Sequence, residues 1–86
     1  MYKIVFGNKF DQQLRNLTRH NRKYVVKIRK IVDLLEHDVD HPSLRLHKLS
    51  GTKWYSISVN KSIRILLSIE KGTIYLLKIG KHEEVY

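Results

Sequence analysis

The chain has 86 residues, and two of its histidines have the type and placement that could support acid–base chemistry. His47 and His82 lie near the ends of expected strands. Imidazole can take up and release a proton near neutral pH, so two of them can supply the base and the acid that cleave RNA through its 2′-hydroxyl. Their separation along the chain does not show that they meet, and a histidine taken singly is more often a surface residue without catalytic work.

Arg64 is a candidate phosphate ligand because it interrupts an apolar strand, between Ile63 and Ile65. A guanidinium in such a place needs an anionic partner or access to solvent. It could bind a phosphate through its bidentate fork. It could equally form a structural ion pair with Glu70 or with a carboxylate of the C-terminal tail.

The charge of the chain favours a polyanionic partner. Lys and Arg number 17 against 8 Asp and Glu, which gives a formal net charge of +9. Such an excess raises the local concentration of phosphates but specifies neither the nucleic acid nor the chemistry, and it also suits a surface neutralised by an acidic protein. Between His41 and Lys81 the only acid is Glu70, and the eight basic residues there are Arg45, Lys48, Lys53, Lys61, Arg64, Lys71, Lys78 and Lys81. The predicted substrate-binding cations are Arg45, Lys48, Lys53 and Lys81.

The first half of the chain predicts a strand followed by a helical hairpin. Residues 2–6 are short, apolar and β-prone, and Gly7 and Asn8 break the run, with Asn8 a plausible helix N-cap. Apolar residues then recur at helical spacing in two stretches joined by a short connection, with Asn21 able to cap the second helix. Their apolar stripes are Phe10, Leu14 and Leu17, and then Tyr24, Ile28, Ile31 and Leu35.

In the second half the periodicity changes from helical to two-residue, beginning at Leu44 and Leu46. Residues 54–59, 63–69 and 74–79 predict strands separated by turns at 60–62 and 71–72. The expected fold is α+β, with about four antiparallel strands in a meander and the helices on its apolar face. The other face should present Ser56, Ser58, Arg64 and Ser68 beside Leu66 and Leu76.

Composition narrows the class of protein. The length suits a single domain over residues 1–86, and the absence of cysteine suits a reducing cytoplasm. No signal peptide or membrane span is expected. The cluster of His37, Asp38, Asp40 and His41 lacks a fixed ligand spacing, so no metal site is expected.

The C-terminal half resembles the RelE/ParE toxin superfamily. The ending Gly80-Lys81-His82-Glu83-Glu84-Val85-Tyr86 is similar to the Gly-x-His-(Asp/Glu)-Glu-Val-Tyr ending of RelE/StbE and YafQ-like members. Residues 44–51, followed by Trp54-Tyr55, resemble the His-x-Leu-x-Gly segment before an aromatic-led strand. Residues 62–66 resemble the Tyr-Arg-(Leu/Ile)-Val strand. The helical hairpin resembles the family only in the order of its elements and in its pattern of apolar residues.

The resemblance implies a RelE-like fold and the toxin of a type II toxin–antitoxin system. It implies a metal-independent endoribonuclease, without cofactor, that cleaves mRNA in the ribosomal A site and is held inactive by a cognate antitoxin. His82 then matches the general acid or compensating cation, Arg64 the phosphate-binding position, Tyr86 the terminal aromatic, and His47 a histidine that some YafQ-like members use.

Two departures leave the general base open, because Ser58 and Ser62 stand where YafQ-like members carry histidine and aspartate. Lys48 is a second candidate for that role beside His47. Trp54 and Tyr86 could stack on bases, although a tryptophan is more often a core residue. The alternative functions are a ParE-like inhibitor of DNA gyrase with the same fold and a non-catalytic basic RNA-binding module.

Overall fold

The computed structural model describes residues 1–85, apart from the side chain of Glu84. Tyr86 lies outside the described residues. The elements are β1 (Lys3–Phe6), α1 (Asn8–Thr18), α2 (Arg22–His37), a short 3₁₀ helix (Pro42–Leu44), β2 (His47–Lys48), β3 (Tyr55–Ser58), β4 (Ile63–Glu70), β5 (Thr73–Lys81) and α3 (His82–Val85). The order of a strand, a helical hairpin and a run of strands confirms the α+β prediction.

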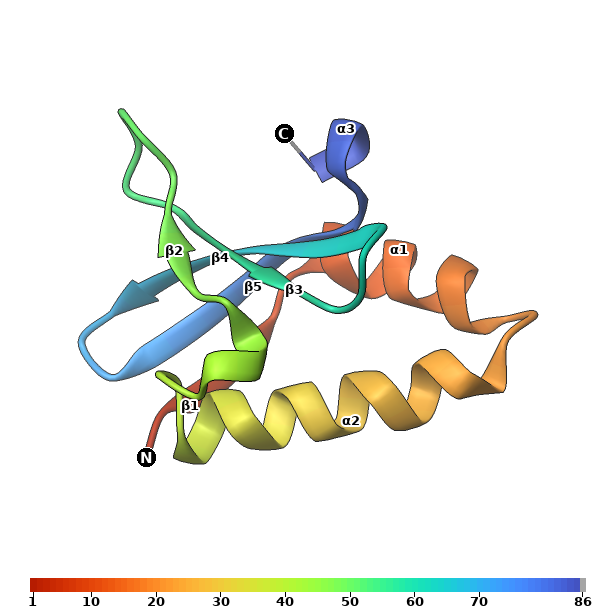
Figure 1. The fold of residues 1–86 in the computed structure, drawn as a ribbon, viewed down its shortest axis with the longest axis horizontal. Coiled ribbons are helices and arrows are strands. Elements are labelled where there is room, and N and C mark those ends of the chain that lie inside the picture. Colours follow the sequence, from red (N-terminus) through yellow and green to blue (C-terminus); the bar gives the residue numbers. More distant parts are fainter. Residues whose placement is uncertain (86) are drawn as a thin grey trace.

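The five strands form one mixed sheet in the order β1-β5-β4-β3-β2. Strands β2 to β5 are antiparallel neighbours, which confirms the meander. β1 adds a fifth strand, parallel to β5, with Ile4 opposite Ile74. The chain therefore passes through the helical hairpin and the other strands before it returns to lie beside its own beginning (Figure 1).

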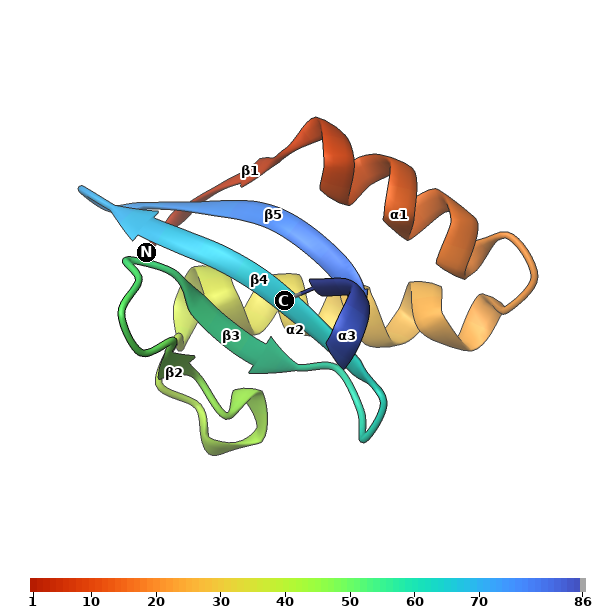
Figure 2. The same cartoon turned by 90° about the horizontal axis from the view of Figure 1, so that it is seen from above.

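The helices cover one face of this sheet, and α3 lies on the other (Figures 1 and 2). The apolar stripes of α1 and α2 supply the buried residues Phe10, Ile28, Ile31 and Leu35, and the strands supply the rest of the same core. Burial of this apolar area is the main favourable term in folding, since each buried large aliphatic or aromatic side chain contributes roughly 1.5–3 kcal/mol. The core thus fixes which sheet face stays available for chemistry.

The two helix starts differ from one another in how they are capped. Asn21 caps α2 as predicted, since its side chain accepts a hydrogen bond of 3.1 Å from the Lys23 N–H. The prediction that Asn8 caps α1 is wrong, because Gly7 occupies that position. Gly7 donates to the carbonyl of Leu76 at 2.9 Å, and a Cβ placed on it would lie 2.8 Å from that same oxygen. The close approach of β5 therefore explains the glycine.

A β-bulge corrects the predicted alternation of β5. Leu66 faces Lys78 and Leu67 faces Leu76, so Leu77 is an extra residue on β5. Because directly opposed residues in an antiparallel pair share a face, Leu76 points into the core with Leu67. The prediction that Leu76 lies on the open face is wrong. Past the bulge the parity changes, and Lys78 takes that face instead.

The spacing of Leu44 and Leu46 predicted that a strand begins there, and this prediction is wrong. Leu44 ends the 3₁₀ helix and is 1% exposed. His41 starts that helix, since its Nδ1 accepts from the Ser43 N–H at 3.2 Å and Pro42 provides the first helical residue. β2 is consequently only two residues long.

Candidate functional site

Arg64 lies in a polar cleft on the sheet face away from α1 and α2. It stands opposite Ser58 on β3 and Gly80 on β5, and its guanidinium Nη1 donates to the Ser58 hydroxyl. The cleft has a volume of about 360 Å³ and is lined by Ser43, Arg45, Ser58, Val59, Asn60, Lys61 and Arg64. None of these is acidic, so three cations face a space that a phosphate could fill.

An ion pair between Arg64 and Glu70 does not account for this position. Both residues lie on β4, six residues apart, which corresponds to roughly 20 Å along a strand. Glu70 is exposed at the far end. The other partner, a carboxylate of the C-terminal tail, stays an open alternative, because the Glu84 side chain and Tyr86 lie outside the described residues. Of the two readings of Arg64, phosphate binding is the one that its surroundings favour.

His47 is exposed on β2, and its backbone surroundings define its tautomer. Its Nδ1 lies 3.0 Å from the carbonyl oxygen of Arg45. Since a carbonyl can only accept, Nδ1 carries the proton in this contact and Nε2 carries the lone pair. Arg45 adopts a left-handed conformation with φ of 51°, which turns the chain between the 3₁₀ helix and β2. This turn brings the Arg45 carbonyl to the histidine.

His82 begins α3, a short helix that the sequence did not predict. Val85 anchors that helix and is 2% exposed. The strand partner of Arg64 is Gly80, two residues before His82. β5 ends at Lys81, so His82 follows this pair closely along the chain and leaves the strand there.

The expectation that His47, Lys48 and His82 meet at one edge of the sheet is wrong. β2 is an edge strand, whereas β5 lies inside the sheet, three strand spacings away, or about 14 Å. Through Ser56 and Leu66, His47 is level with Lys78, and β5 ends three residues farther along at Lys81. The Cα atoms of His47 and Lys81 are therefore roughly 17 Å apart, and His82 follows Lys81 at the start of α3. Arg64 lies between them on the sheet.

Two of the predicted substrate-binding lysines lie on the helix-covered side. Lys48 pairs with Tyr55, which contacts the core, so it shares that side and not the side of His47. Lys81 pairs with Ile63 and lines a depression beside α1 with Gln13 and Asn16. Lys53 is exposed in the loop between β2 and β3. Arg45 alone among the four faces the Arg64 cleft.

Trp54 borders a second cleft on the same open face. The burial that is usual for a tryptophan does not occur, since Trp54 is 42% exposed. The cleft has a volume of about 320 Å³ and is lined by Leu49, Thr52, Trp54, Leu66, Leu77, Lys78 and Val85. An indole beside a lysine on an apolar floor suits the stacking of a base with its phosphate held nearby.

Sequence reasoning did not assign Ser58, Lys61 or Lys78 to the site. Parity placed Ser58 on the open face with Arg64, but gave it no role in the site. Lys61 could have been found from its position in the turn next to that strand. Lys78 gave no such signal, because the bulge at Leu77 that turns it outward lies within a continuous apolar run.

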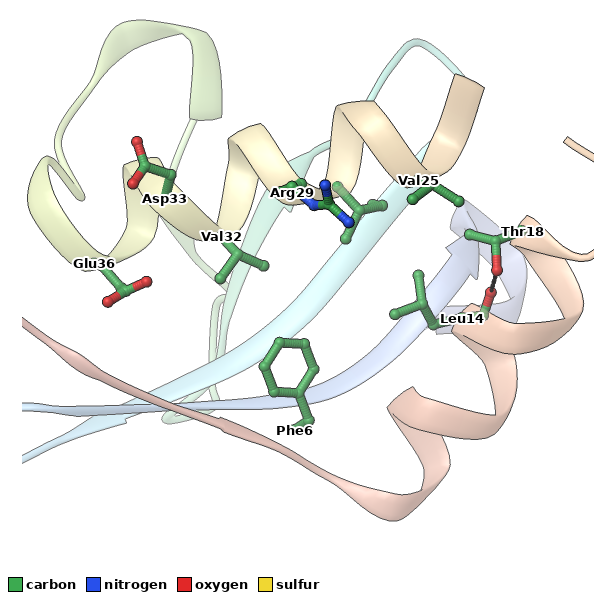
Figure 3. A pocket seen from close by; sticks show the side chains of 9 residues that line it. Phe6, Leu14, Thr18, Val25, Arg29, Val32, Asp33 and Glu36 are labelled. Atoms are coloured by element: carbon green, nitrogen blue, oxygen red, sulfur yellow. Dashed lines mark hydrogen bonds between the residues drawn. The ribbon is translucent and has the colours of Figure 1, made fainter. Parts of the chain in front are cut away.

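A further cavity, of about 420 Å³, is an apolar groove between β1, α1 and α2 (Figure 3). Phe6, Leu14 and Val32 point into it, and Arg29, Asp33 and Glu36 lie at its rim. Phe6 is 46% exposed. The lining lacks a set of groups suited to acid–base work on a phosphate, so the candidate site remains on the opposite face of the sheet.

The cluster around residues 37–41 is held by local contacts. His37 Nδ1 lies 3.0 Å from the carbonyl and 3.4 Å from the carboxylate of Asp33, and His41 Nδ1 lies 2.8 Å from the Ser43 hydroxyl. Among the side chains that the structure describes, which exclude those of Glu84 and Tyr86, no three His, Asp or Glu come together as a metal site would need. No helix within residues 1–85 is both long and apolar enough to span a membrane.

Comparison with known proteins identifies the fold. A family model described as the ParE-like toxin domain matches residues 16–85. By sequence, no curated protein matches the chain.

Three solved structures are similar over nearly the whole length. A metal-bound toxin from Helicobacter pylori superposes with a TM-score of 0.84 at 21% identity, covering 100% of both chains. The DinJ–YafQ complex from Escherichia coli gives 0.80 at 14% identity, covering 100% of this chain and 99% of the other. The YoeB–YefM complex from Staphylococcus aureus gives 0.78 at 19%, covering 95% and 98%. The predicted toxin fold is confirmed.

Proposed function

Since this chain belongs to the ParE-like toxin domain family, we propose that it is the toxin of a type II toxin–antitoxin pair and cleaves messenger RNA on the ribosome without a metal. The observation that carries this proposal is the Arg64 cleft. Arg45, Lys61 and Arg64 line it without an acidic residue, with His47 on β2 to one side and His82, at the start of α3 after β5, to the other.

The order of these three groups supports cleavage by in-line attack. The 2′-oxygen attacks phosphorus while the bond to the 5′-oxygen breaks on the opposite side, which leaves a 2′,3′-cyclic phosphate and a 5′-hydroxyl. The base and the acid must therefore lie on opposite sides of the phosphate, with a cation beside it. In this proposal His47 Nε2 takes the 2′ proton, Arg64 stabilises the developing charge, and His82 protonates the 5′-oxygen.

The separation of the histidines is compatible with this proposal, because each imidazole can extend from its Cα toward the phosphate. Two hydrogen bonds of about 2.8 Å, reacting atoms about 3–3.5 Å apart and the breaking P–O bond together span roughly 10 Å between the two imidazole nitrogens. Both histidines lie on elements able to move, since β2 pairs through only two residues and α3 has four. Short elements with few contacts open at low free-energy cost.

A cognate antitoxin is the proposed protein partner. The similar structures from Staphylococcus aureus and Escherichia coli contain YefM and DinJ with their toxins. For this chain, we expect an acidic segment of the antitoxin to cover the cations of the open sheet face. Its association should then be fast and should slow as salt is added. An association rate that is indifferent to salt would contradict this arrangement.

A translation reaction with purified ribosomes, followed by primer extension on the message, tests the function. The proposal expects cuts that depend on the added protein and disappear with Arg64→Ala. The second candidate, inhibition of DNA gyrase, is favoured by the description of the matching family. Intact message together with loss of supercoiling activity in a gyrase assay would decide for that candidate. Bound but uncut RNA would decide for a non-catalytic binding module.

A further inference from the structure

The helical hairpin carries a second stretch of positive charge, comparable to that of the sheet. From residue 12 to residue 32 the sequence has no Asp or Glu, and its seven basic residues are Arg15, Arg19, Arg22, Lys23, Lys27, Arg29 and Lys30. All seven are exposed. Arg15 pairs with Asp11 at 2.9 Å, outside this range. The other six lie around the connection and on α2, and the proposed active site uses none of them.

The turn between β3 and β4 connects this basic surface to the Arg64 cleft. Figure 1 shows the turn reaching from the sheet toward α2. The Asn60 amide donates to the Tyr24 hydroxyl of α2 at 3.3 Å. The side-chain oxygen Oδ1 of Asn60 accepts hydrogen bonds from the backbone N–H groups of Ser62 and Ile63, each at 2.8 Å. One side chain thus both shapes the turn and ties it to the helix.

Asn60 is also shared by two adjoining clefts. The Arg64 cleft ends at Asn60 and Lys61. On the other side of Asn60 a depression of about 330 Å³ is lined by Asn21, Lys23, Tyr24, Lys27 and Asn60. No described lining residue of either cleft is acidic. A cationic path therefore runs from Arg64 over Lys61 to Lys23 and Lys27.

We propose that this path binds the backbone of the RNA strand where it leaves the active site, with Lys23 and Lys27 each contacting a phosphate. The inference rests on the proposed RNA-cleaving function and extends the site onto α2. A basic groove with an aromatic side chain along it is the usual surface for single-stranded RNA, and Tyr24, which packs partly against the core, also lines this groove. An acidic protein would also be attracted, but continuity with the phosphate-binding cleft favours the RNA strand.

The test measures binding of two RNAs to the full chain as salt is varied. One RNA has about four nucleotides and the other about sixteen, the span of site sizes for single-stranded-binding modules. The double variant Lys23→Gln/Lys27→Gln should leave binding of the short RNA unchanged. For the long RNA it should weaken binding severalfold and reduce the slope of log K against log salt by about 1.4, or 0.7 for each lost contact.

The matched control is Lys3→Gln/Lys71→Gln, which removes the same charge at the other end of the sheet. These lysines flank Gly72, whose carbonyl accepts from the Lys3 N–H at 2.9 Å, and the length of β4 separates them from the β3–β4 turn, roughly 26 Å. The path is refuted if both double variants give equal slopes while the wild-type chain still cleaves RNA. It is also refuted if the α2 variant loses affinity for polyglutamate and not for RNA. A wild-type chain that cuts no message in the ribosome reaction would instead refute the proposed function.

Discussion

Replacing Arg64 is the perturbation that separates a catalytic role from a structural one. The side chain is half-buried and bonded to Ser58, in a cleft that also holds Arg45 and Lys61. Removing one preorganised hydrogen-bond donor that stabilises developing negative charge raises the activation free energy by about 2–4 kcal/mol. Arg64→Ala should therefore slow cleavage roughly 30- to 900-fold. Arg64→Lys keeps the charge but loses the planar fork, so it should retain binding better than rate.

The structural part of the effect is small by comparison. Arg64→Ala also removes the hydrogen bond to Ser58, worth about 1 kcal/mol of unfolding free energy. In a domain of this size that lowers Tm by roughly 4–8 °C. Single-turnover cleavage in the ribosome reaction should be measured beside RNA affinity and thermal unfolding, so that each rate refers to folded protein.

Ser58→Ala is the matched control, because it removes the same hydrogen bond and leaves the guanidinium in place. It should lower Tm to a similar extent and slow cleavage much less than Arg64→Ala. If both Arg64 variants lower Tm while cleavage per folded molecule stays normal, Arg64 is a structural residue and the phosphate site is misplaced.

Three further predictions concern the surroundings of the site and the fold. His82→Ala should lower cleavage by roughly two to four decades with circular dichroism unchanged, and a folded variant of normal rate would remove His82 from the mechanism. Trp54 is the only tryptophan, so RNA should quench its fluorescence, and Trp54→Ala should weaken RNA binding by about 1–3 kcal/mol; an unchanged affinity would exclude stacking. Gly7→Ala should lower the unfolding free energy in urea by about 1–3 kcal/mol because its Cβ meets the Leu76 carbonyl, and an unchanged value would mean that β5 yields freely.

Periodicity was enough to predict the two long helices, α1 and α2, and the meander. The stripe from Tyr24 to Leu35 and the alternation from Ile63 to Ile69 each bury one side, so local spacing and tertiary contacts agree. The position of each strand within the sheet was harder to predict from the sequence. Nothing in residues 2–6 specifies β5 as a parallel neighbour, because that pairing depends on how the hairpin returns the chain.

The site was predicted as a set of residues but not as an arrangement. Parity on β4 placed Arg64 correctly on the open face, since its neighbours alternate without interruption. The position of Lys78 depended on a bulge that apolar residues conceal. The distance between His47 and His82 depended on the order of the strands in the sheet, which the sequence around each histidine does not encode. Resemblance at the chain end identified His82 and not the short helix that carries it.

The central claim, that the RNA's own 2′-oxygen attacks the phosphate, is tested most directly by a message with one 2′-deoxynucleotide. It is placed immediately 5′ to a mapped cut, and primer extension compares it with the all-ribose message. The account predicts that the cut at that position disappears while cuts elsewhere remain. A cut that persists at the deoxy position would mean that water or another nucleophile attacks the phosphate, and the roles given to His47, Arg64 and His82 would be wrong.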